Sequence, residues 1–483
     1  MAHDISFSSV EEATAYLGAV LDRPVVSHDS AVADGAVLTQ RAHHFPDGGF
    51  TNVYDIAWSR DLVSAGIRVH EQPAHVSHTD RRAVATTSGS FFALADRTPV
   101  LPRHTSLNLV VRDGRALSLP VADREAVVCR GGDLSVEHVP AAGLLEVNGT
   151  VLPWRGSRRG GAGAGRGGGV DTGAGTGAGA EVYGNGNISI EVDNARNRSR
   201  AVRESSKHTP PTGDPDVVDV GFDAAEGGVF RSSAARAGGG LPLFPHDVVI
   251  RCPRALVRGT GDTLRVLQVG PWPAGRLPDH AVSAGPSLHH PDLAGHPINA
   301  DPSLGDNPPF AEVRAARMLL HGGADGRIHV TLFDARPGSA DLVGATPEEA
   351  RAYVAARFGF TWGCFLDGGS TARIWTRQDT AVRDYGNRHY LRWPTGTQTD
   401  YVWEPAKGRP MANHLLLMPR YLDIGRGRPG PARTRRAGAG PDTPHGIEQA
   451  LKARFPVAAP PAARGAGAPP PQQRAGRGAA RRG

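Results

Sequence analysis

The chain has 483 residues, of which 39% are hydrophobic and 21% are charged, and its formal net charge is +6. No stretch is long and apolar enough for a transmembrane helix, and three isolated cysteines form neither a disulfide framework nor a zinc knuckle. The first residues also lack the basic and apolar regions of a secretion signal. We therefore expect a soluble, cytoplasmic protein with reduced thiols and no membrane partner.

The positive charge lies near the C-terminal end. From Arg426 to Arg482 there are 12 Lys or Arg and 2 Asp or Glu, a net charge of +10 that leaves −4 for the remainder. Nearly all basic residues are arginine and the chain has 62 glycines and 39 prolines, which indicates a GC-rich genome rather than selection for phosphate contacts. A disordered, solvated tail is the favoured interpretation, and weak RNA binding through this tail is the alternative.

Two low-complexity stretches divide the chain. Residues 156–180 are almost entirely Gly, Ala, Arg and Thr, and residues 425–483 are mainly Pro, Ala, Gly and Arg. Neither stretch can bury a core, so we expect both to be disordered. We expect residues 1–40 to be a helical segment packed on the main domain, and residues 41–424 to form that domain.

The expected elements begin with a helix. Ser9-Val-Glu-Glu12 is a capping box, and the helix it opens ends before Pro24. Short β-branched and aromatic runs then predict strands, with Asp113-Gly114 and Asn148-Gly149 as hairpin turns. The strands expected here are 52–58, 84–87, 106–112, 144–152, 187–192, 247–251 and 263–269.

The C-terminal third predicts one continuous supersecondary unit. Strands 317–321 and 328–333 flank the turn Asp325-Gly-Arg327, and Thr346-Pro-Glu-Glu349 caps a helix that stops at Gly359. Strand 360–366 follows and ends at Asp367. These elements predict an α+β fold: a single large domain, rich in mixed or antiparallel sheet, with a few covering helices.

The segment Phe365-Leu-Asp-Gly-Gly-Ser-Thr371 is the best candidate for chemistry. An apolar strand leads into an acid, two glycines and two hydroxyl residues. Because glycine has no side chain, its backbone N–H groups can approach an anionic ligand beside the carboxylate and the hydroxyls. Taken alone, Asp-Gly-Gly-Ser is also an ordinary turn.

Six motifs in order resemble the phosphodiester glycosidase domain, the family of the lysosomal uncovering enzyme, N-acetylglucosamine-1-phosphodiester α-N-acetylglucosaminidase. The motifs are Ser88-Gly-Ser-Phe-Phe92, Ser283-Ala-Gly-Pro-Ser287, Ala316-Arg317 with Asp325-Gly-Arg327, Phe333-Asp-Ala-Arg336, Gly344-Ala-Thr-Pro-Glu-Glu-Ala350 and Leu366-Asp-Gly-Gly-Ser370. The chain departs from the family pattern where Ser88 replaces an asparagine and where the last turn is one glycine short. The resemblance implies a shared fold and hydrolysis of a sugar from a glycosyl phosphodiester.

The chemistry assigns roles to these residues. A phosphate ester is already an acidic leaving group, so its departure needs positive charge more than a proton. Arg317 and Arg336 would clamp phosphate, and Asp367 or Asp334 would act as nucleophile or base. Substrate binding is assigned to the hydroxyls, glycines and aromatic rings of Ser88, Gly89, Phe91, Phe92, Ser283, Gly285, Gly368, Gly369, Ser370 and Thr371.

Simpler structural interpretations stay open for several of them. Phe91 and Phe92 are equally typical of a core pair, Arg336 beside Asp334 of a structural ion pair, and Ser283 of a strand-ending turn. Three groups of neighbouring histidines are expected in Pro- and Gly-containing loops: His43-His44, His75 with His78, and His289-His290 with His296. None has the i, i+4 spacing with an intervening Glu of a helical zinc site. We expect no metal and no cofactor, because no phosphate-binding or dinucleotide fingerprint is present.

Two classes of function follow. The first is a phosphodiester glycosidase acting on a sugar-phosphate small molecule in secondary or envelope metabolism. The second is a non-catalytic carbohydrate- or phosphate-binding protein of the same fold. The sequence leaves open the sugar, the aglycone, the stereochemical outcome, the oligomeric state and whether a divalent ion lies by Asp367.

Overall fold

The computed structural model describes residues 5–75, 80–90, 106, 108–157, 179–184, 208–243, 246–293, 313–336, 339–378, 381–386, 391–392, 401–403 and 410–420. All of these residues lie within the unit Met1–Gly425. The 425–483 tail, most of the 156–180 insert, Phe91, Phe92 and the strand expected at 187–192 lie outside the described residues.

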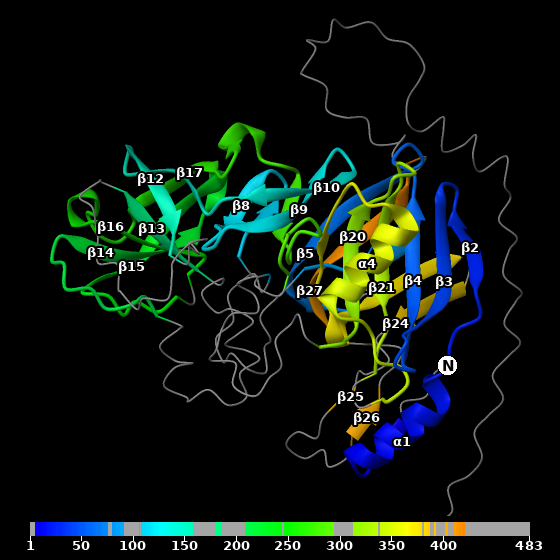
Figure 1. The fold of residues 1–483 in the computed structure, drawn as a ribbon. Helices are drawn as coiled ribbons and strands as arrows, with labels where there is room; N and C mark the ends of the chain where they lie inside the picture. Colours follow the sequence, from blue (N-terminus) through cyan, green and yellow to red (C-terminus); the bar gives the residue numbers. More distant parts are fainter. Residues whose placement is uncertain are drawn as a thin grey trace, which may run out of the picture. The chain divides into compact units, whose positions relative to one another are not determined.

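Two sheets enclose the main core (Figure 1). The six-stranded sheet has the order β2 (His28–Ala33), β3 (Ala36–His44), β4 (Phe50–Trp58), β21 (Ile328–Phe333), β20 (Arg317–Gly322) and β22 (Trp362–Phe365). The second sheet, called the β5 sheet, has the order β24 (Ala381–Gly386), β23 (Arg373–Gln378), β6 (Ala85–Ser88), β27 (Met411–Pro419) and β5 (Val63–Ala74). Ile56, Leu320 and Leu332 of the first sheet and Ile67, Leu415 and Ile374 of the second share one buried cluster.

A third sheet, called the β9 sheet, is buried on both faces. Its order is β10 (Asp133–Val139), β9 (Arg124–Arg130), β19 (His280–Ser283), β7 (Val110–Arg112) and β8 (Arg115–Ser118). Val127 and Val282 belong to the main core, whereas Val128 and Ala281, one residue away on each strand, belong to a second core. Because successive side chains of a strand point to opposite faces, one face of this sheet packs in the main core and the other face packs in the second core.

The second core fills a closed barrel. Its strands run β11 (Ala142–Val147), β12 (Thr150–Gly156), β13 (Ala180–Tyr183), β16 (Val248–Pro253), β14 (Val217–Ala224), β15 (Val229–Ala237) and β17 (Thr263–Val269), with β18 (Trp272–Pro273) beside β17. The ring closes because β11 pairs with both β12 and β17. A last small sheet joins β1 (Ile5–Phe7), β26 (Tyr401–Trp403) and β25 (Leu391–Arg392).

The expected α+β class is wrong. Among the described residues the α-helices are α1 (Val10–Leu21) and α4 (Pro347–Phe358), and the architecture is a β-sandwich joined to a β-barrel. The physical reason is that the described sheets mostly cover one another, while helix α4 buries the sheet face that carries Phe333 and Phe365. Residues 28–44, within and beside the expected N-terminal helical segment, form β2 and β3.

Several local predictions are confirmed. Asp113-Gly114 and Asn148-Gly149 have positive φ angles and connect β7 to β8 and β11 to β12. The hairpin of β20 and β21 and the start of α1 after Ser9 also agree with the sequence. None of the described helices is long and apolar enough to span a bilayer.

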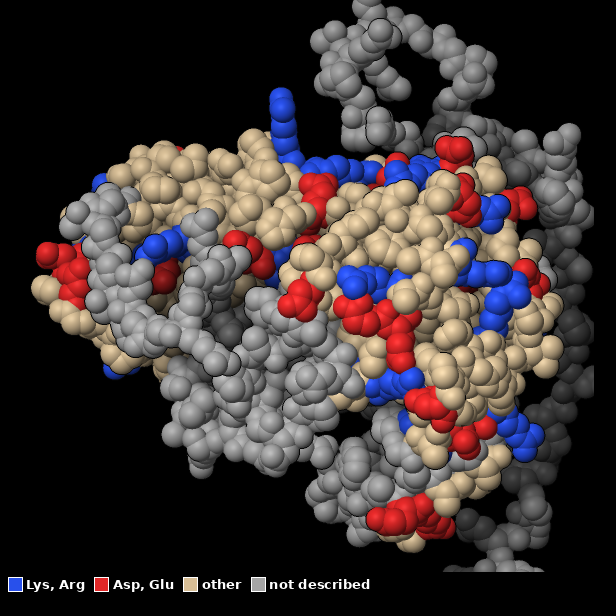
Figure 2. Space-filling model, in the orientation of Figure 1, with Lys and Arg blue, Asp and Glu red and all other residues tan. Residues whose placement is uncertain are grey.

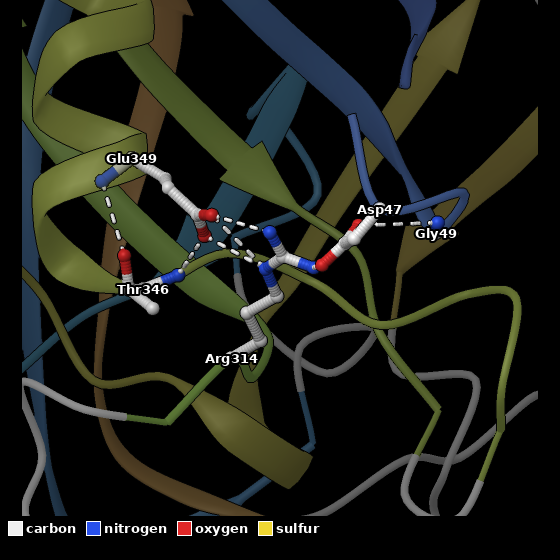
Figure 3. A network of polar contacts seen from close by, with 5 residues as sticks. All are labelled: Asp47, Gly49, Arg314, Thr346 and Glu349. Atoms are coloured by element: carbon white, nitrogen blue, oxygen red, sulfur yellow. Dashed lines mark hydrogen bonds and ion pairs between the residues drawn. The ribbon is translucent and has the colours of Figure 1, made fainter. Parts of the chain in front are cut away.

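Helix α4 is fixed to the six-stranded sheet through its first turn (Figure 3). Thr346 and Glu349 form the expected capping box, and Gly359 ends the helix in the left-handed conformation. The same Glu349 carboxylate accepts hydrogen bonds from Arg314 Nε at 3.0 Å and Nη2 at 2.6 Å, while Arg314 Nη1 donates to Asp47 Oδ2 at 2.6 Å. Burial alone would raise the pKa of Glu349, but the bonds from Arg314 and Thr346 outweigh it and lower that pKa.

Removing this guanidinium should loosen α4. Because the Arg314 side chain is 23% exposed and the charges are partly screened, we expect Arg314→Ala to lower the free energy of unfolding by about 1–2 kcal/mol. Denaturant unfolding measures this change. Arg327→Ala is the control, since Arg327 lies 4.0 Å from an exposed Asp325, and should change stability by less than about 0.5 kcal/mol. Equal effects of the two substitutions would contradict the role given to Arg314.

Candidate active site

The turn after β22 carries the chain from the six-stranded sheet to the β5 sheet. Leu366 is buried and Asp367 is half-buried. The Asp367 N–H donates to the Gly89 carbonyl at 3.0 Å, the Gly368 N–H to Asp367 Oδ1 at 3.0 Å, and the Gly369 N–H to the Ala316 carbonyl at 2.8 Å. Both glycine N–H groups expected to approach an anion therefore bind protein oxygens. Asp367 is therefore a half-buried residue whose Oδ1 accepts a hydrogen bond within the turn.

Ser88 and Thr371 hold this turn against strand β6. The Arg373 N–H donates to Ser88 Oγ at 3.0 Å, and the Ser88 hydroxyl donates to the Thr371 carbonyl. The Thr371 hydroxyl in turn donates to the Gly368 carbonyl at 2.6 Å. Ser88 and Thr371 are both buried, so their hydroxyls stabilise the turn. The side chain of Ser370 lies outside the described residues.

The sheet register brings Arg317 and Asp334 to the same end of the six-stranded sheet as Asp367. Arg317 is opposite Phe333, and the bonds from Leu366 N–H to Met318 and from Gly369 N–H to Ala316 place Arg317 beside the turn. Its guanidinium, however, donates to the Ala345 carbonyl at 3.2 Å and the Val313 carbonyl at 2.6 Å. Burial lowers the pKa of Arg317 to about 10.

Asp334 is fully buried and structural contacts surround its backbone. Its N–H donates to the Asn52 carbonyl at 2.8 Å, and its own carbonyl accepts from Thr51 Oγ1 at 2.8 Å. A nucleophile or a base must reach a substrate or water, whereas Asp334 has no exposed surface. Asp367 is thus the more accessible of the two acids assigned to catalysis.

Arg336 forms a buried ion pair with Asp22, the residue after α1. Arg336 Nε donates to Asp22 Oδ1 at 2.8 Å, and Nη2 donates to Oδ2 at 2.6 Å. Ser339 also donates to this carboxylate. The two side chains are 6% and 4% exposed, so the pair fixes the N-terminal segment to the sandwich. The structural ion pair considered for Arg336 is present, but its partner is Asp22 and not Asp334.

Ser283 and Gly285 also bind protein groups. Ser283 Oγ accepts hydrogen bonds from the Asn108 amide at 2.9 Å and from the Leu109 N–H at 3.1 Å. The Gly285 N–H donates to the Phe365 carbonyl at 2.8 Å. This segment therefore packs along β22 and supports the strand that leads to Asp367.

A polar cluster that the sequence did not reveal lies next to the turn, on the face of the β5 sheet opposite the main core. It consists of His70, Ser88, Arg373, Asp384 and His414, and we call it the polar sheet face. His70 Nε2 lies 2.8 Å from His414 Nδ1, and Arg373 Nε donates to Asp384 Oδ1 at 2.6 Å. The register places His414 directly opposite Ser88. Among the described residues, His414 Nε2 has no hydrogen-bond partner.

No motif could identify this cluster, because each member comes from a different strand. One signal was available in the sequence: the mostly apolar run that forms β27 contains the polar pair Asn413 and His414. Asn413 Oδ1 accepts a hydrogen bond from the Ser90 N–H at 2.5 Å, next to Gly89. Polar residues within a run that is buried on both faces indicate a paired or functional site.

Both imidazoles of the polar sheet face are held in the neutral form. Burial lowers the pKa of His70 to about 4, and the charge of Arg68 acts in the same direction. Burial also lowers the pKa of His414 well below its usual value, with further lowering by His70, Arg373 and His75. At neutral pH these rings can exchange hydrogen bonds but carry no charge.

Burial of His70 and His414 in the neutral form predicts that the folded protein loses stability in acid. In the unfolded chain each imidazole has a pKa near about 6.5 and takes up a proton that the folded form resists. Stability should therefore be retained above about pH 6.5 and fall as the pH drops towards about 4. Thermal unfolding across this range should show a shallower pH dependence in His414→Gln than in wild type. The control is His138→Gln, whose side chain is 59% exposed, and an unchanged slope in His414→Gln would refute the interpretation.

Gly89 is required by close packing. A Cβ at this position would lie 2.0 Å from Asn413 Oδ1 and 2.8 Å from the Asn413 carbonyl oxygen. We expect Gly89→Ala to lower the free energy of unfolding by about 1–3 kcal/mol, measured by denaturant unfolding. Gly275→Ala, where a Cβ meets nothing within 4 Å, should stay within about 0.5 kcal/mol of wild type. Tolerance of Gly89→Ala would mean that the contact between Gly89 and β27 is not rigid.

Charged side chains of both signs are intermixed on the face shown in Figure 2.

Comparison with known proteins gives distant matches in structure only. No family model matches the chain, and no curated protein matches it. A hypothetical protein from Synechocystis has a TM-score of 0.47 at 15% identity, over 81% of this chain and 64% of that one. A putative exported protein from Burkholderia pseudomallei has a TM-score of 0.41 at 17% identity, over 77% and 74%.

A third structure is the zebrafish N-acetylglucosamine-1-phosphodiester α-N-acetylglucosaminidase catalytic domain, auto-inhibited by its pro-peptide. Its TM-score is 0.31 at 11% identity, over 86% of this chain and 95% of that one. This chain is thus distantly similar to a glycosidase domain and spans less than two thirds of the Synechocystis protein. Similarity at this level assigns no activity.

Proposed function

We propose that this protein is a hydrolase that releases a sugar from a glycosyl phosphodiester, with Asp367 as the catalytic carboxylate. One observation supports the proposal above the others: Asp367 is half-buried after a buried strand, and its N–H donates a hydrogen bond to the Gly89 carbonyl, next to β6 of the second sheet. A reactive group on a rigid strand end keeps its geometry better than one on a free loop. The order of the six sequence motifs supports the same reaction.

The reaction needs one well-placed carboxylate. The bond between the anomeric carbon and the phosphate oxygen breaks, and that oxygen leaves with the bonding electrons as a phosphate monoester. Asp367 either attacks the anomeric carbon or takes a proton from the attacking water. If Asp367 attacks, water then attacks the anomeric carbon of the sugar–Asp367 ester, the carboxylate leaves with the bonding electrons, and the proton of water passes to solvent or to the phosphate. If Asp367 acts as base, the carboxylate takes that proton directly and releases it to solvent. In both routes water supplies the hydroxyl of the released sugar. Because phosphate leaves readily, a second carboxylic acid is not required.

The arginines contribute differently from the sequence expectation. Arg317 lies beside the turn, with its guanidinium bonded to the Ala345 and Val313 carbonyls, and Arg336 is paired with Asp22. We therefore assign Arg317 as a positioning residue for the turn. The Arg373 guanidinium is likewise paired with Asp384 on the polar sheet face, and the backbone N–H of Arg373 donates to Ser88 Oγ and so supports the same turn.

Asp367→Asn tests the proposal. Loss of the carboxylate should lower kcat/KM for release of reducing sugar by about 100- to 10 000-fold, because the amide can neither attack nor accept a proton at neutral pH. A panel of sugar phosphodiesters with different sugars and aglycones serves as substrates. Asp61→Asn, in an exposed turn, is the matched control and should keep full activity. Activity in Asp367→Asn equal to wild type would exclude Asp367 as the catalytic group.

A specific observation favours a second candidate function, a non-catalytic sugar-binding protein. Arg317, Arg336 and both glycine N–H groups of the turn, which would stabilise the leaving phosphate in the hydrolase, bind protein groups instead. Calorimetric titration of the same panel distinguishes the two candidates. Saturable binding without release of sugar by the wild-type protein would support the binding protein.

A further inference from the structure

Three buried side chains that can ligate metal lie together on the six-stranded sheet: Asp55 of β4, His321 of β20 and His329 of β21. One potential ligand atom from each side chain lies within 4.8 Å of those of the other two. Among the described residues, this is the group of three or more His, Cys, Asp or Glu side chains that come this close together. The group lies near the end of β20 opposite Arg317. It is therefore separate from Asp367 and independent of the proposed hydrolase activity.

The strand register explains the cluster. His321 is directly opposite His329, and Asp55 is opposite Thr331, two residues further along β21. Side chains two residues apart on a strand share a face, so the three groups project from one face of three adjacent strands. The imidazole rings are stacked, with centroids 4.9 Å apart and an interplanar angle of 3°.

Helix α4 encloses the group. The ring of Phe358, the last residue of α4, lies 4.6 Å from the His329 ring and 5.4 Å from the His321 ring. Asp55, His321 and His329 are 3%, 0% and 2% exposed. Gly323 leaves space for this arrangement, since a Cβ there would lie 2.8 Å from His329 Nε2. The site is thus enclosed by protein, and Asp325 Oδ1, 3.4 Å from His329 Nε2, lies on its solvent side.

Protein hydrogen bonds satisfy this group only in part. Asp55 Oδ2 lies 2.9 Å from His329 Nδ1, Thr331 Oγ1 donates to Asp55 Oδ1 at 2.7 Å, and His321 Nε2 lies 2.9 Å from Thr331 Oγ1. His321 Nδ1 is buried and has no hydrogen-bond partner among the described residues. A buried ring nitrogen without a partner is costly in a purely structural network.

We propose that Asp55, His321 and His329 bind a divalent transition-metal ion of the zinc type, with water completing the coordination shell. Imidazole nitrogen and carboxylate oxygen are the ligands that such ions take in three-residue protein sites. Thr331 would act as an outer partner that orients Asp55. This site differs from the sequence expectation of no metal, which considered only the histidines in loops.

Cobalt binding tests this proposal on the full-length protein. The protein is freed of metal with a chelator and titrated with Co²⁺, which reports coordination through its visible absorption. We expect one Co²⁺ per chain in wild type, displaced by Zn²⁺, and affinity at least about 100-fold weaker in His321→Gln. His280→Gln is the matched control, because His280 is a half-buried strand histidine outside the cluster, and its affinity should equal wild type.

Two further measurements keep the test decisive if His321→Gln folds poorly. Zn²⁺ should raise the Tm of wild type and not that of Asp55→Asn, because binding to the folded state alone stabilises it. X-ray absorption of the Zn²⁺-loaded wild type should show imidazole nitrogens at about 2.0–2.1 Å. Absence of stoichiometric Co²⁺ binding to wild type would overturn the proposal. So would binding that persists unchanged in both His321→Gln and Asp55→Asn.

Discussion

The candidate active site depends on one backbone hydrogen bond, which runs from the Asp367 N–H to the Gly89 carbonyl at 3.0 Å. It joins the end of β22 in one sheet to the end of β6 in the other, so the turn is held by both sides of the main core. The buried Ser88 hydroxyl reinforces the connection through Thr371 and Arg373. The backbone of Asp367 is thus anchored to both sheets.

Short-range rules in the sequence were accurate because neighbouring residues satisfy them. The capping box of Thr346 and Glu349 and the hairpin turns at Asp113 and Asn148 need only a few consecutive residues to form. The fold class was wrong because it depends on pairings between distant segments. The residues near β11 in the sequence do not indicate that this strand also pairs with β17 and closes a barrel.

The same distinction applies to the site. Asp367 could be predicted as an acid at a strand end because the strand and the glycine turn are contiguous in the chain. The guanidinium partners could not, because Asp22, just after α1, meets Arg336 only when the chain has folded. Strand pairing between distant segments likewise brings His70 and His414 together, and the same holds for Asp55, His321 and His329. The sequence interpretation placed His43 in a loop, whereas it lies at the end of β3, and it did not consider the strand histidines His70, His321, His329 and His414, of which the last three are buried.

The β9 sheet places Val127 in the core of the sandwich and Val128 in the core of the barrel. A wall shared in this way couples the two halves thermodynamically, since neither hydrophobic interior can open without exposing the other to water. The barrel should therefore not melt as an autonomous module, and its excision would leave an apolar surface on the remaining half. Long insertions are more easily tolerated in the barrel loops away from the β9 sheet than in the strands of the β9 sheet itself.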